Sequence, residues 1–284
     1  MAKTVAVLFG EGDRPENYVV SALANYWRED GIEVRYLFGT REAVPADLLI
    51  VHVDLSVLPA DYLRFARRYP RVLNGQVRDI RKRAFSRLLL SRCSDYGGPV
   101  IVKTDLNCGG QPEIRHFRHQ IRRANPLLRL WHRRRLACFI AAQGAAADTY
   151  RVYPSLQAVP DEDWDEPSRV VEKFVPERIE GRYAVRTYHF LGNSESFYLL
   201  LSDQPVVKGT TGVEARAFEP DPRLRVLRRA LGFEYGKFDY VLHEGEPVLL
   251  DINKTVGLNT RFLHDPEIEK ARRGRARGLH DFLA

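Results

Sequence analysis

Residues 237 to 253 restrict the possible folds most, because they have the pattern of a β-hairpin whose strands contain acidic and amide side chains. The apolar runs KFDYVL and PVLLDIN flank a polar HEGE turn, which predicts an antiparallel pair. Residues two apart in a strand face the same side, so Asp251 and Asn253 point together and Asp239 on the partner strand can join them. Aspartate and asparagine are poor strand formers, which argues against an ordinary solvated face. This all-oxygen cluster favours a hard divalent cation, Mg²⁺ or alternatively Mn²⁺.

The same residues resemble the metal-binding end of the ATP-grasp superfamily, in which an acidic residue in one strand precedes an acidic-x-Asn triplet closing the next. The triplet here is Asp251-Ile252-Asn253 rather than the usual Glu-x-Asn, and Lys254-Thr255-Val256-Gly257 replaces the usual small-residue turn. Lys254 places a cation beside the cluster, to meet a phosphate or to balance the carboxylates. The resemblance covers roughly residues 74–265 and implies an ATP-grasp core of two α+β lobes that uses ATP and Mg²⁺.

Length and composition indicate a globular protein with more than one lobe. The chain has 284 residues, of which 44% are hydrophobic and 29% charged. No run approaches the ~20 apolar residues that span a bilayer, so no membrane partner is expected. Three cysteines, Cys93, Cys108 and Cys138, lack metal-site spacing, which together with the lack of a signal peptide favours the reduced cytoplasm. The sequence leaves monomer and homodimer open.

Strands alternate with helices over the first 73 residues, which predicts a small α/β domain with a parallel sheet. Strands are expected at 4–9, 32–38 and 47–54, with a helix at 17–29 and another in LPADYLRFARRY. The Gly10-Glu11-Gly12 loop has Pro15 at the third glycine position of the dinucleotide fingerprint, which argues against a nicotinamide site.

The remainder, residues 74–284, is expected to form the ATP-grasp domain. A helix is predicted from Asp79 to about Arg92, and VIVKT predicts a strand. Further strands are expected in TYRVYPS and SRVVEKFV, a hairpin around Gly192-Asn193, and a helix in PDPRLRVLRRALG. The domain then divides into a nucleotide lobe at 95–175, with an arginine-rich, largely helical insertion at 109–147, a metal-binding lobe at 176–265, and a basic tail.

Two lysines and a glycine loop are the expected phosphate ligands. Lys103 ends an apolar strand, where burial is costly unless an anion meets its ammonium. By the resemblance, Lys103 and the earlier Lys82 hold the nucleotide phosphates, although a surface position is an equal alternative for Lys82. The loop that follows contains Gly109 and Gly110, whose backbone N–H groups can approach phosphate oxygens.

The segment SRVVEKFVPERIEG resembles the hinge that binds the nucleoside. The resemblance implies that backbone groups of Lys173 and Val175 bind the adenine edge, with Glu172 beside them and Phe174 or Val175 providing apolar contact. Glu180 would bind the ribose hydroxyls, and Glu177 is the alternative residue for this role. An amphipathic edge strand followed by a charged turn is the alternative interpretation.

Two further cations are candidate catalytic groups. Arg186 lies mid-strand in YAVRTYHFLG and resembles the arginine of the ATP-grasp branch that adds amino acids to carboxylates. Lys208, in VVKGTTG, would touch the substrate or the γ-phosphate, with an ordinary loop lysine as the alternative.

The net charge of +7 is concentrated in two regions. Between residues 109 and 135 eight arginines accompany one acidic residue, Glu113, and the tail after Glu269 is also basic. Such clusters attract polyanions, although solvated helix faces are the alternative, and for the tail the favoured one. His116 and His119 in this insertion are expected to face solvent rather than to bind a transition metal.

Together these features predict an ATP- and Mg²⁺-dependent carboxylate–amine ligase that forms an acylphosphate and releases ADP and phosphate. Its partners would be a small carboxylate and an amine, one of them acidic or phosphorylated if the basic insertion recognises substrate. Two alternatives remain: a phosphotransferase acting on a hydroxylated substrate, and a basic protein that binds nucleic acid or another polyanion on a decayed ATP-grasp fold.

Overall fold

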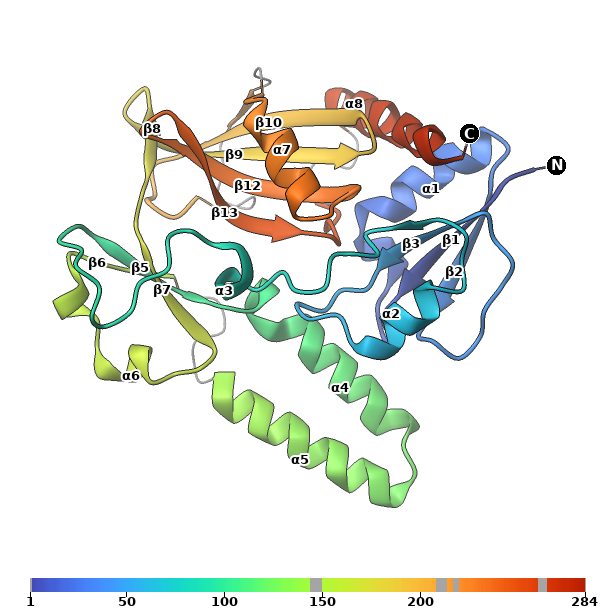
Figure 1. Cartoon of the computed structure of the whole chain (residues 1–284), viewed down its shortest axis with the longest axis horizontal. Helices are drawn as coiled ribbons and strands as arrows, with labels where there is room; N and C mark the ends of the chain where they lie inside the picture. Colours follow the sequence, from blue (N-terminus) through green and yellow to red (C-terminus); the bar gives the residue numbers. More distant parts are fainter. Residues whose placement is uncertain (1, 144–149, 208–213, 217–219, 260–264, 284) are drawn as a thin grey trace.

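The computed structural model describes residues 2–143, 150–207, 214–216, 220–259 and 265–283, which form three sheets with helices around them (Figure 1). The first sheet is parallel throughout and has the order β2-β1-β3-β4. Its strands are β1 (Thr4–Phe9), β2 (Glu33–Phe38), β3 (Leu48–His52) and β4 (Val72–Leu73). This confirms the predicted parallel α/β domain.

The strand β1 is apolar on both faces because helices cover both sides of the sheet. Val5, Val7 and Phe9 pack into the cluster that contains helix α1 (Val19–Glu29). Ala6 and Leu8 pack into the cluster that contains helix α2 (Ala60–Ala66). The predicted helices therefore lie on opposite faces of the sheet.

The second sheet is a small antiparallel one, with the order β6-β5-β7. It consists of β5 (Val100–Thr104), β6 (Arg151–Tyr153) and β7 (Arg169–Lys173), and the short helix α6 (Asp161–Trp164) precedes β7. Val100, Val102 and Val171 form its core with Leu156 and Val159. The intervening residues of β5 and β7 point to the opposite face of this sheet, and these include Lys103 and Glu172.

The third sheet is antiparallel and contains both predicted hairpins. Its order is β11-β10-β9-β12-β13, and β8 pairs with β9. Its strands are β8 (Glu177–Ile179), β9 (Arg182–Leu191), β10 (Ser194–Ser202), β11 (Glu214–Arg216), β12 (Tyr235–His243) and β13 (Glu246–Asn253), with helix α7 (Arg223–Ala230) before β12. Glu244 and Gly245 form the turn between β12 and β13 with φ of 53° and 76°, the paired positive values of a tight hairpin turn.

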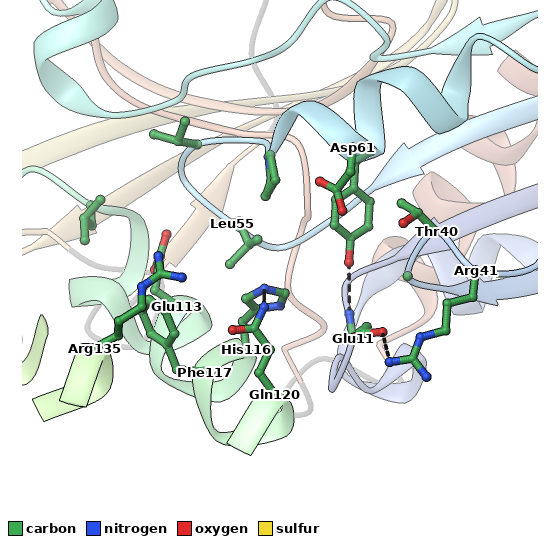
Figure 2. A pocket seen from close by; sticks show the side chains of 15 residues that line it. Glu11, Thr40, Arg41, Leu55, Asp61, Glu113, His116, Phe117, Gln120 and Arg135 are labelled. Atoms are coloured by element: carbon green, nitrogen blue, oxygen red, sulfur yellow. Dashed lines mark hydrogen bonds and ion pairs between the residues drawn. The ribbon is translucent and has the colours of Figure 1, made fainter. Parts of the chain in front are cut away.

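The predicted basic helical stretch is a helical hairpin of α4 (Gln111–Arg123) and α5 (Pro126–Gln143), which projects from the body of the molecule (Figure 1). The N-terminal part of α4 faces the first domain across a pocket (Figure 2). Arg115 binds the Asp54 carboxylate at 2.6 Å, so part of the insertion is anchored to that domain.

The prediction of a helix from Asp79 to about Arg92 is wrong in length, because α3 spans only Lys82–Phe85. The following leucines run extended along β7, where Leu90 N–H donates to the Val171 carbonyl at 2.9 Å. Leu88 is 6% exposed in this conformation. Pairing with an open strand edge and burial of a leucine therefore outweigh helix continuation.

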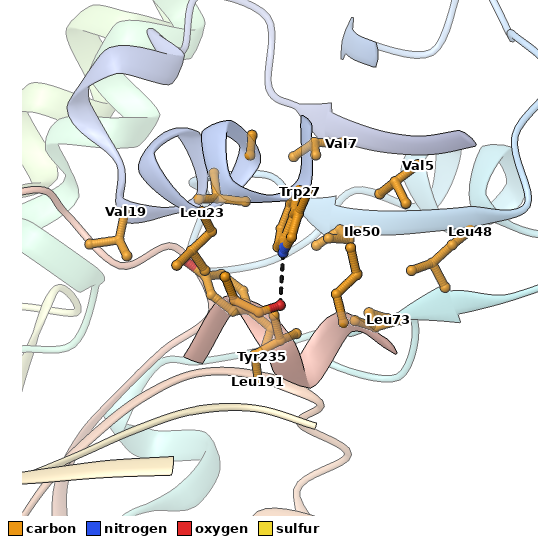
Figure 3. Packing of buried hydrophobic residues seen from close by; sticks show 14 of the residues in the cluster. Val5, Val7, Val19, Leu23, Trp27, Leu48, Ile50, Leu73, Leu191 and Tyr235 are labelled. Carbon is orange, nitrogen blue, oxygen red and sulfur yellow. Dashed lines mark hydrogen bonds between the residues drawn. The ribbon is translucent and has the colours of Figure 1, made fainter. Parts of the chain in front are cut away.

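The basic tail is a solvated face only in part, since Lys270, Arg273 and Arg277 are exposed but Arg272 and Arg275 are buried. Helix α8 (Pro266–Ala276) packs against α1, and Arg272 and Arg275 are 3% and 5% exposed. The indole N–H of Trp27 donates to the Ala276 carbonyl at 2.9 Å, which joins the two ends of the chain in one core (Figure 3). None of the helices in the described part of the chain is long and apolar enough to cross a membrane. The three cysteines are free.

Candidate functional site

The β12–β13 hairpin brings the three predicted oxygen ligands together. Asp239 lies opposite Asp251 in the strand register, and a bulge follows directly between Asp239 and Tyr240. The Asn253 amide donates to Asp251 Oδ2 at 3.0 Å. The two carboxylates and the amide thus form one cluster, here called the oxygen cluster, at the end of the sheet.

Lys237 is a member of this group that the sequence interpretation missed. Its ammonium donates to Asp239 Oδ2 at 2.7 Å, and its strand partner is Asn253. Burial lowers the pKa of Lys237, but Asp239 and Asp251 outweigh that effect and raise it. The sequence contains the information needed to find it, because Lys237 lies two residues before Asp239 in a strand and therefore on the same face.

The oxygen cluster fits a divalent cation. Asp239 Oδ1 is buried and has no hydrogen-bond partner among the described residues. Burial, and next the facing Asp251 carboxylate, raise the pKa of Asp239, which a cation would reverse. Within the described ranges no group of three or more His, Cys, Asp or Glu side chains is arranged for a metal, so water and phosphate oxygens would complete this coordination.

Lys82 faces the oxygen cluster from α3. Its side chain is 3% exposed, which excludes the surface-lysine alternative, and its ammonium lies 3.5 Å from Asp251 Oδ1. Burial lowers the pKa of Lys82, but Asp251, Tyr150 and Glu172 together raise it above its ordinary value. The ammonium is therefore charged beside Asp251.

Lys103 lies on the neighbouring lobe with its ammonium 2.5 Å from the Glu172 carboxylate. The side chains are 8% and 1% exposed, so this is a buried ion pair between β5 and β7. The predicted need of Lys103 for an anion is met by Glu172 in this structure. Glu172 is thus the ion-pair partner of Lys103.

The glycine loop follows β5 in an uncommon backbone conformation. Cys108, Gly109 and Gly110 have successive φ of 47°, 60° and 75°, all left-handed. Only glycine adopts this region freely, so the two glycines permit the turn that starts α4. Desolvation, followed by the charges of Asp54 and Asp251, raises the pKa of the Cys108 thiol to about 11.

The predicted adenine hinge is partly occupied by the chain itself. The N–H of Lys173 donates to the Leu88 carbonyl at 2.8 Å, and that of Phe174 to the Pro99 carbonyl at 2.9 Å. The Lys173 N–H is therefore not open to a base in this conformation, because residues 88–90 cover that edge of β7. Val175 is 6% exposed and packs with Leu88.

Arg186 and the two glutamates proposed for ribose lie in different surroundings. The Arg186 guanidinium binds the Glu177 carboxylate with three contacts, 3.0 Å from Nε to each oxygen and 2.6 Å from Nη2 to Oε1. Glu177 also accepts the Leu242 N–H at 2.9 Å. Glu180 lies at the β8–β9 turn, with a side chain 58% exposed and a φ of 52°. Lys208 lies outside the described residues.

Lys254 directly follows Asn253, the last residue of β13. It is fully buried, and its ammonium has no hydrogen-bond partner within the described ranges. Burial lowers its pKa to about 8, partly offset by Asp54, Glu113 and Asp79. Of these carboxylates, Asp54 belongs to the first domain, Asp79 precedes α3 and Glu113 lies in the insertion.

The two insertion histidines are partly buried rather than fully solvent-facing. His116 contacts the Gln120 amide at 2.9 Å, and His119 packs beneath Gly12. Burial lowers the pKa of both histidines. They share no further metal ligand in the described part of the chain.

No family model and no curated protein sequence matches this chain. Its structure is similar to the D-alanine–D-alanine ligase from Bacillus anthracis, with 11% identity, coverage of 99% of this chain and 96% of that one, and a TM-score of 0.50. It is also similar to the macrocyclase MdnC from Microcystis aeruginosa MRC bound with precursor peptide MdnA, with 11% identity, coverage of 98% and 99%, and a TM-score of 0.50. A RimK-domain ATP-grasp protein from Sphaerobacter thermophilus has 14% identity, coverage of 97% and 99%, and a TM-score of 0.48.

These likenesses extend over nearly the whole chain and define a two-lobed α/β architecture preceded by a parallel α/β domain. The chain has the ATP-grasp fold, as the sequence predicted.

Proposed function

We propose that the protein is an ATP- and Mg²⁺-dependent ligase that joins a carboxylate to an amine. The observation that supports this most directly is the convergence of Lys82 with the oxygen cluster, where its ammonium lies 3.5 Å from Asp251 Oδ1. Two structures similar to this one are of a ligase and of a macrocyclase bound with its precursor peptide. The carboxylate would attack the γ-phosphate, ADP would leave, and an amine would displace phosphate from the acylphosphate.

Two lysines would bind the phosphates. Lys82 is held beside Asp251, and Lys103 is held by Glu172, so both ammonium groups are positioned before the nucleotide arrives. The backbone N–H groups of Gly109 and Gly110 would add neutral donors. Positive charge placed in advance in this way lowers the barrier for phosphoryl transfer.

Asp239, Asp251 and Asn253 would hold Mg²⁺, which when bound supplies charge neutralisation at the β- and γ-phosphates. Lys237 would keep the Asp239 carboxylate oriented through its 2.7 Å hydrogen bond.

Arg186 and Lys208 complete the proposed catalytic set. Arg186 lies on β9 beside Tyr240 of β12, and Glu177 fixes its guanidinium. It would stabilise charge on the transferring group, while Lys208 would contact the substrate or γ-phosphate. Closure of the lobes would exclude water, which otherwise hydrolyses an acylphosphate.

The nucleoside would lie along the end of β7. Val175 and the carbonyl of Lys173 would meet the adenine edge, Phe174 would contact the base, and Glu172 would act through Lys103. Glu180 would bind the ribose, because Glu177 is already bound to Arg186.

The decisive experiment is calorimetric titration of ATP with and without Mg²⁺, followed by product analysis with panels of acids and amines. Micromolar, Mg²⁺-dependent binding with amide, ADP and free phosphate as products supports the proposal. Asp251→Asn should abolish turnover, whereas Asp95→Asn at an exposed position should not. Phosphate retained on a hydroxylated product would show a phosphotransferase instead. Absence of ATP binding combined with salt-sensitive binding of nucleic acid would show a polyanion-binding protein.

A further inference from the structure

A pocket of about 640 Å³ lies between the first domain and the α4–α5 hairpin (Figure 2). One wall consists of α2 and the segments that follow β1, β2 and β3, and the other consists mainly of α4. We call it the insertion pocket. Carboxyl ends of parallel strands are where open α/β sheets bind ligands. Because the helical insertion forms the second wall, the pocket depends on a segment that the ordinary ATP-grasp pattern lacks.

The α4 wall presents two buried oxygen atoms that lack donors. Glu113 Oε1 accepts the Ser56 N–H at 2.8 Å, but Glu113 Oε2 is buried and has no hydrogen-bond partner among the described residues. The same holds for Oε1 of Gln120, whose amide nitrogen contacts His116 at 2.9 Å. Buried acceptors without donors are costly, so this wall favours a ligand that donates hydrogen bonds.

The opposite wall adds negative charge. Asp61 on α2 is exposed and belongs to the pocket lining (Figure 2). Burial lowers the pKa of His116, which is only partly offset by Glu11 and Asp61, so the imidazole between these carboxylates is neutral near pH 7. The histidine therefore does not neutralise Asp61, whereas the charge of Glu113 also acts on the buried ammonium of Lys254.

The two arginines of the pocket already have partners. Arg41 lies 3.5 Å from the Glu11 carboxylate. The Arg135 guanidinium lies over the rings of Phe117 and Trp131, at 5.2 and 4.6 Å from their centroids. The lining therefore has three carboxylates, Glu11, Asp61 and Glu113, against the two guanidinium groups, which leaves one net negative charge.

The remaining lining is largely apolar, including Leu55, Val57, Tyr62 and Phe117. Such a lining suits the hydrocarbon part of a ligand, while the few polar groups determine its orientation. The pocket therefore combines a negatively charged, acceptor-rich side with an apolar one.

We propose that the insertion pocket binds a primary ammonium group on an apolar or aromatic stem, with Glu113 and Gln120 accepting its N–H groups. Asp61 supplies the second negative charge, and Tyr62 and Phe117 contact the stem. The pocket reaches Leu106, directly before the glycine loop, so in a ligase it would hold the amine-bearing substrate next to the phosphates. That role rests on the proposed function, whereas ammonium binding itself does not.

The test uses three probes of similar shape and different charge: 2-phenylethylamine, 2-phenylethanol and phenylacetate. Each is titrated calorimetrically into the full chain at neutral pH without ATP. We expect the amine to bind about 10-fold more tightly than the alcohol, because its hydrogen bonds are charge-assisted, and phenylacetate not to bind.

Matched variants assign the binding to this pocket. Glu113→Gln and Asp61→Asn should each weaken 2-phenylethylamine about 5- to 10-fold, while Asp95→Asn at a distant exposed position should leave it unchanged. Asp61 is exposed, so this variant remains informative if Glu113→Gln does not fold. Phenylacetate binding as tightly as the amine, failure of all three probes, or wild-type amine affinity in both variants would each overturn the proposal.

ATP titration of the same proteins separates this proposal from the proposed function. We expect Glu113→Gln and Asp61→Asn to keep wild-type affinity for ATP. Amine binding without ATP binding would retain the pocket and reject the ligase, and the reverse result would reject only the pocket.

Discussion

The ammonium of Lys103 lies 2.5 Å from the Glu172 carboxylate across the diagonal of two paired strands, since Lys103 pairs in register with Val170 and Glu172 with Ile101. Both side chains are nearly inaccessible to water. Each charge is therefore tolerated because the other is present. This pair holds the Lys103 ammonium on the face of β5 and β7 opposite their apolar core.

Lys103→Met should destabilise the fold by about 3–5 kcal/mol, because it leaves the Glu172 carboxylate buried without its partner. The double variant Lys103→Met/Glu172→Met removes both charges and should recover most of that loss. Urea denaturation measures the free energy of unfolding of all three proteins. Both variants should bind ATP more weakly than the wild type, because both lack the Lys103 ammonium. Wild-type ATP affinity in the double variant would exclude Lys103 as a phosphate ligand.

Lys237→Met should strengthen divalent-cation binding about tenfold, because it removes a positive charge that donates to Asp239 at 2.7 Å. Titration of Mn²⁺ followed by electron paramagnetic resonance reports the free ion directly. Lys173→Met serves as a control, since that ammonium lies over the Tyr96 ring rather than in the oxygen cluster. Equal Mn²⁺ affinity in wild type and Lys237→Met would argue against a metal at Asp239.

The Asp13 carboxyl group should make the protein less stable as pH rises. An ion-paired carboxylate usually has the opposite effect, since it stabilises the fold more at higher pH. Burial, followed by the charge of Asp54, raises its pKa from 3.8 to about 6. The folded state binds this proton more tightly than the unfolded state, so the stabilisation is complete below pH 3.8 and is lost as pH rises through about 6. The loss should reach at most about 3 kcal/mol.

Asp13→Asn removes the titration and keeps an oxygen acceptor for the Gly10 N–H. The difference in free energy of unfolding between wild type and this variant should therefore change across that pH window. Denaturation curves at several pH values measure it, and parallel pH profiles for the two proteins would contradict the prediction.

Gly278→Ala should destabilise the protein by at least about 2 kcal/mol, because a Cβ at this position would overlap the Leu191 carbonyl and force a buried contact apart. Gly274→Ala in the neighbouring helix α8 is the matched control, since its Cβ would meet no atom within 4 Å. That change should stabilise by about 0.5–1 kcal/mol, the helix preference of alanine over glycine. Thermal denaturation of both variants tests whether the contact with β9 depends on Gly278.

The β12–β13 hairpin was predictable because its information is local. Turn residues, strand alternation and the two-residue period together place Asp239, Asp251 and Asn253 on one face. The same period would have identified Lys237. The parallel sheet of the first domain was predictable for a similar reason, since β1 is apolar on both faces and helical spacing follows it.

The failures have one physical cause, which is competition from partners remote in sequence. Residues 88–90 have the composition of a helix but lie extended, because β7 offers an unpaired edge. Arg272 and Arg275 look like tail residues but are buried against elements distant in sequence. The insertion pocket combines Asp61 with Glu113 and Gln120, and no spacing in the chain indicates that these residues meet.

The hydrogen bond from Trp27 to the Ala276 carbonyl has a consequence for biosynthesis (Figure 3). The core of the first domain includes Ala276, Leu279 and Leu283, so it is incomplete while the ribosome is still making the later strands. During that interval α1 exposes the apolar surface that α8 later covers. A nascent chain of this protein should therefore depend on chaperones that shield early-made apolar helices until translation passes residue 283.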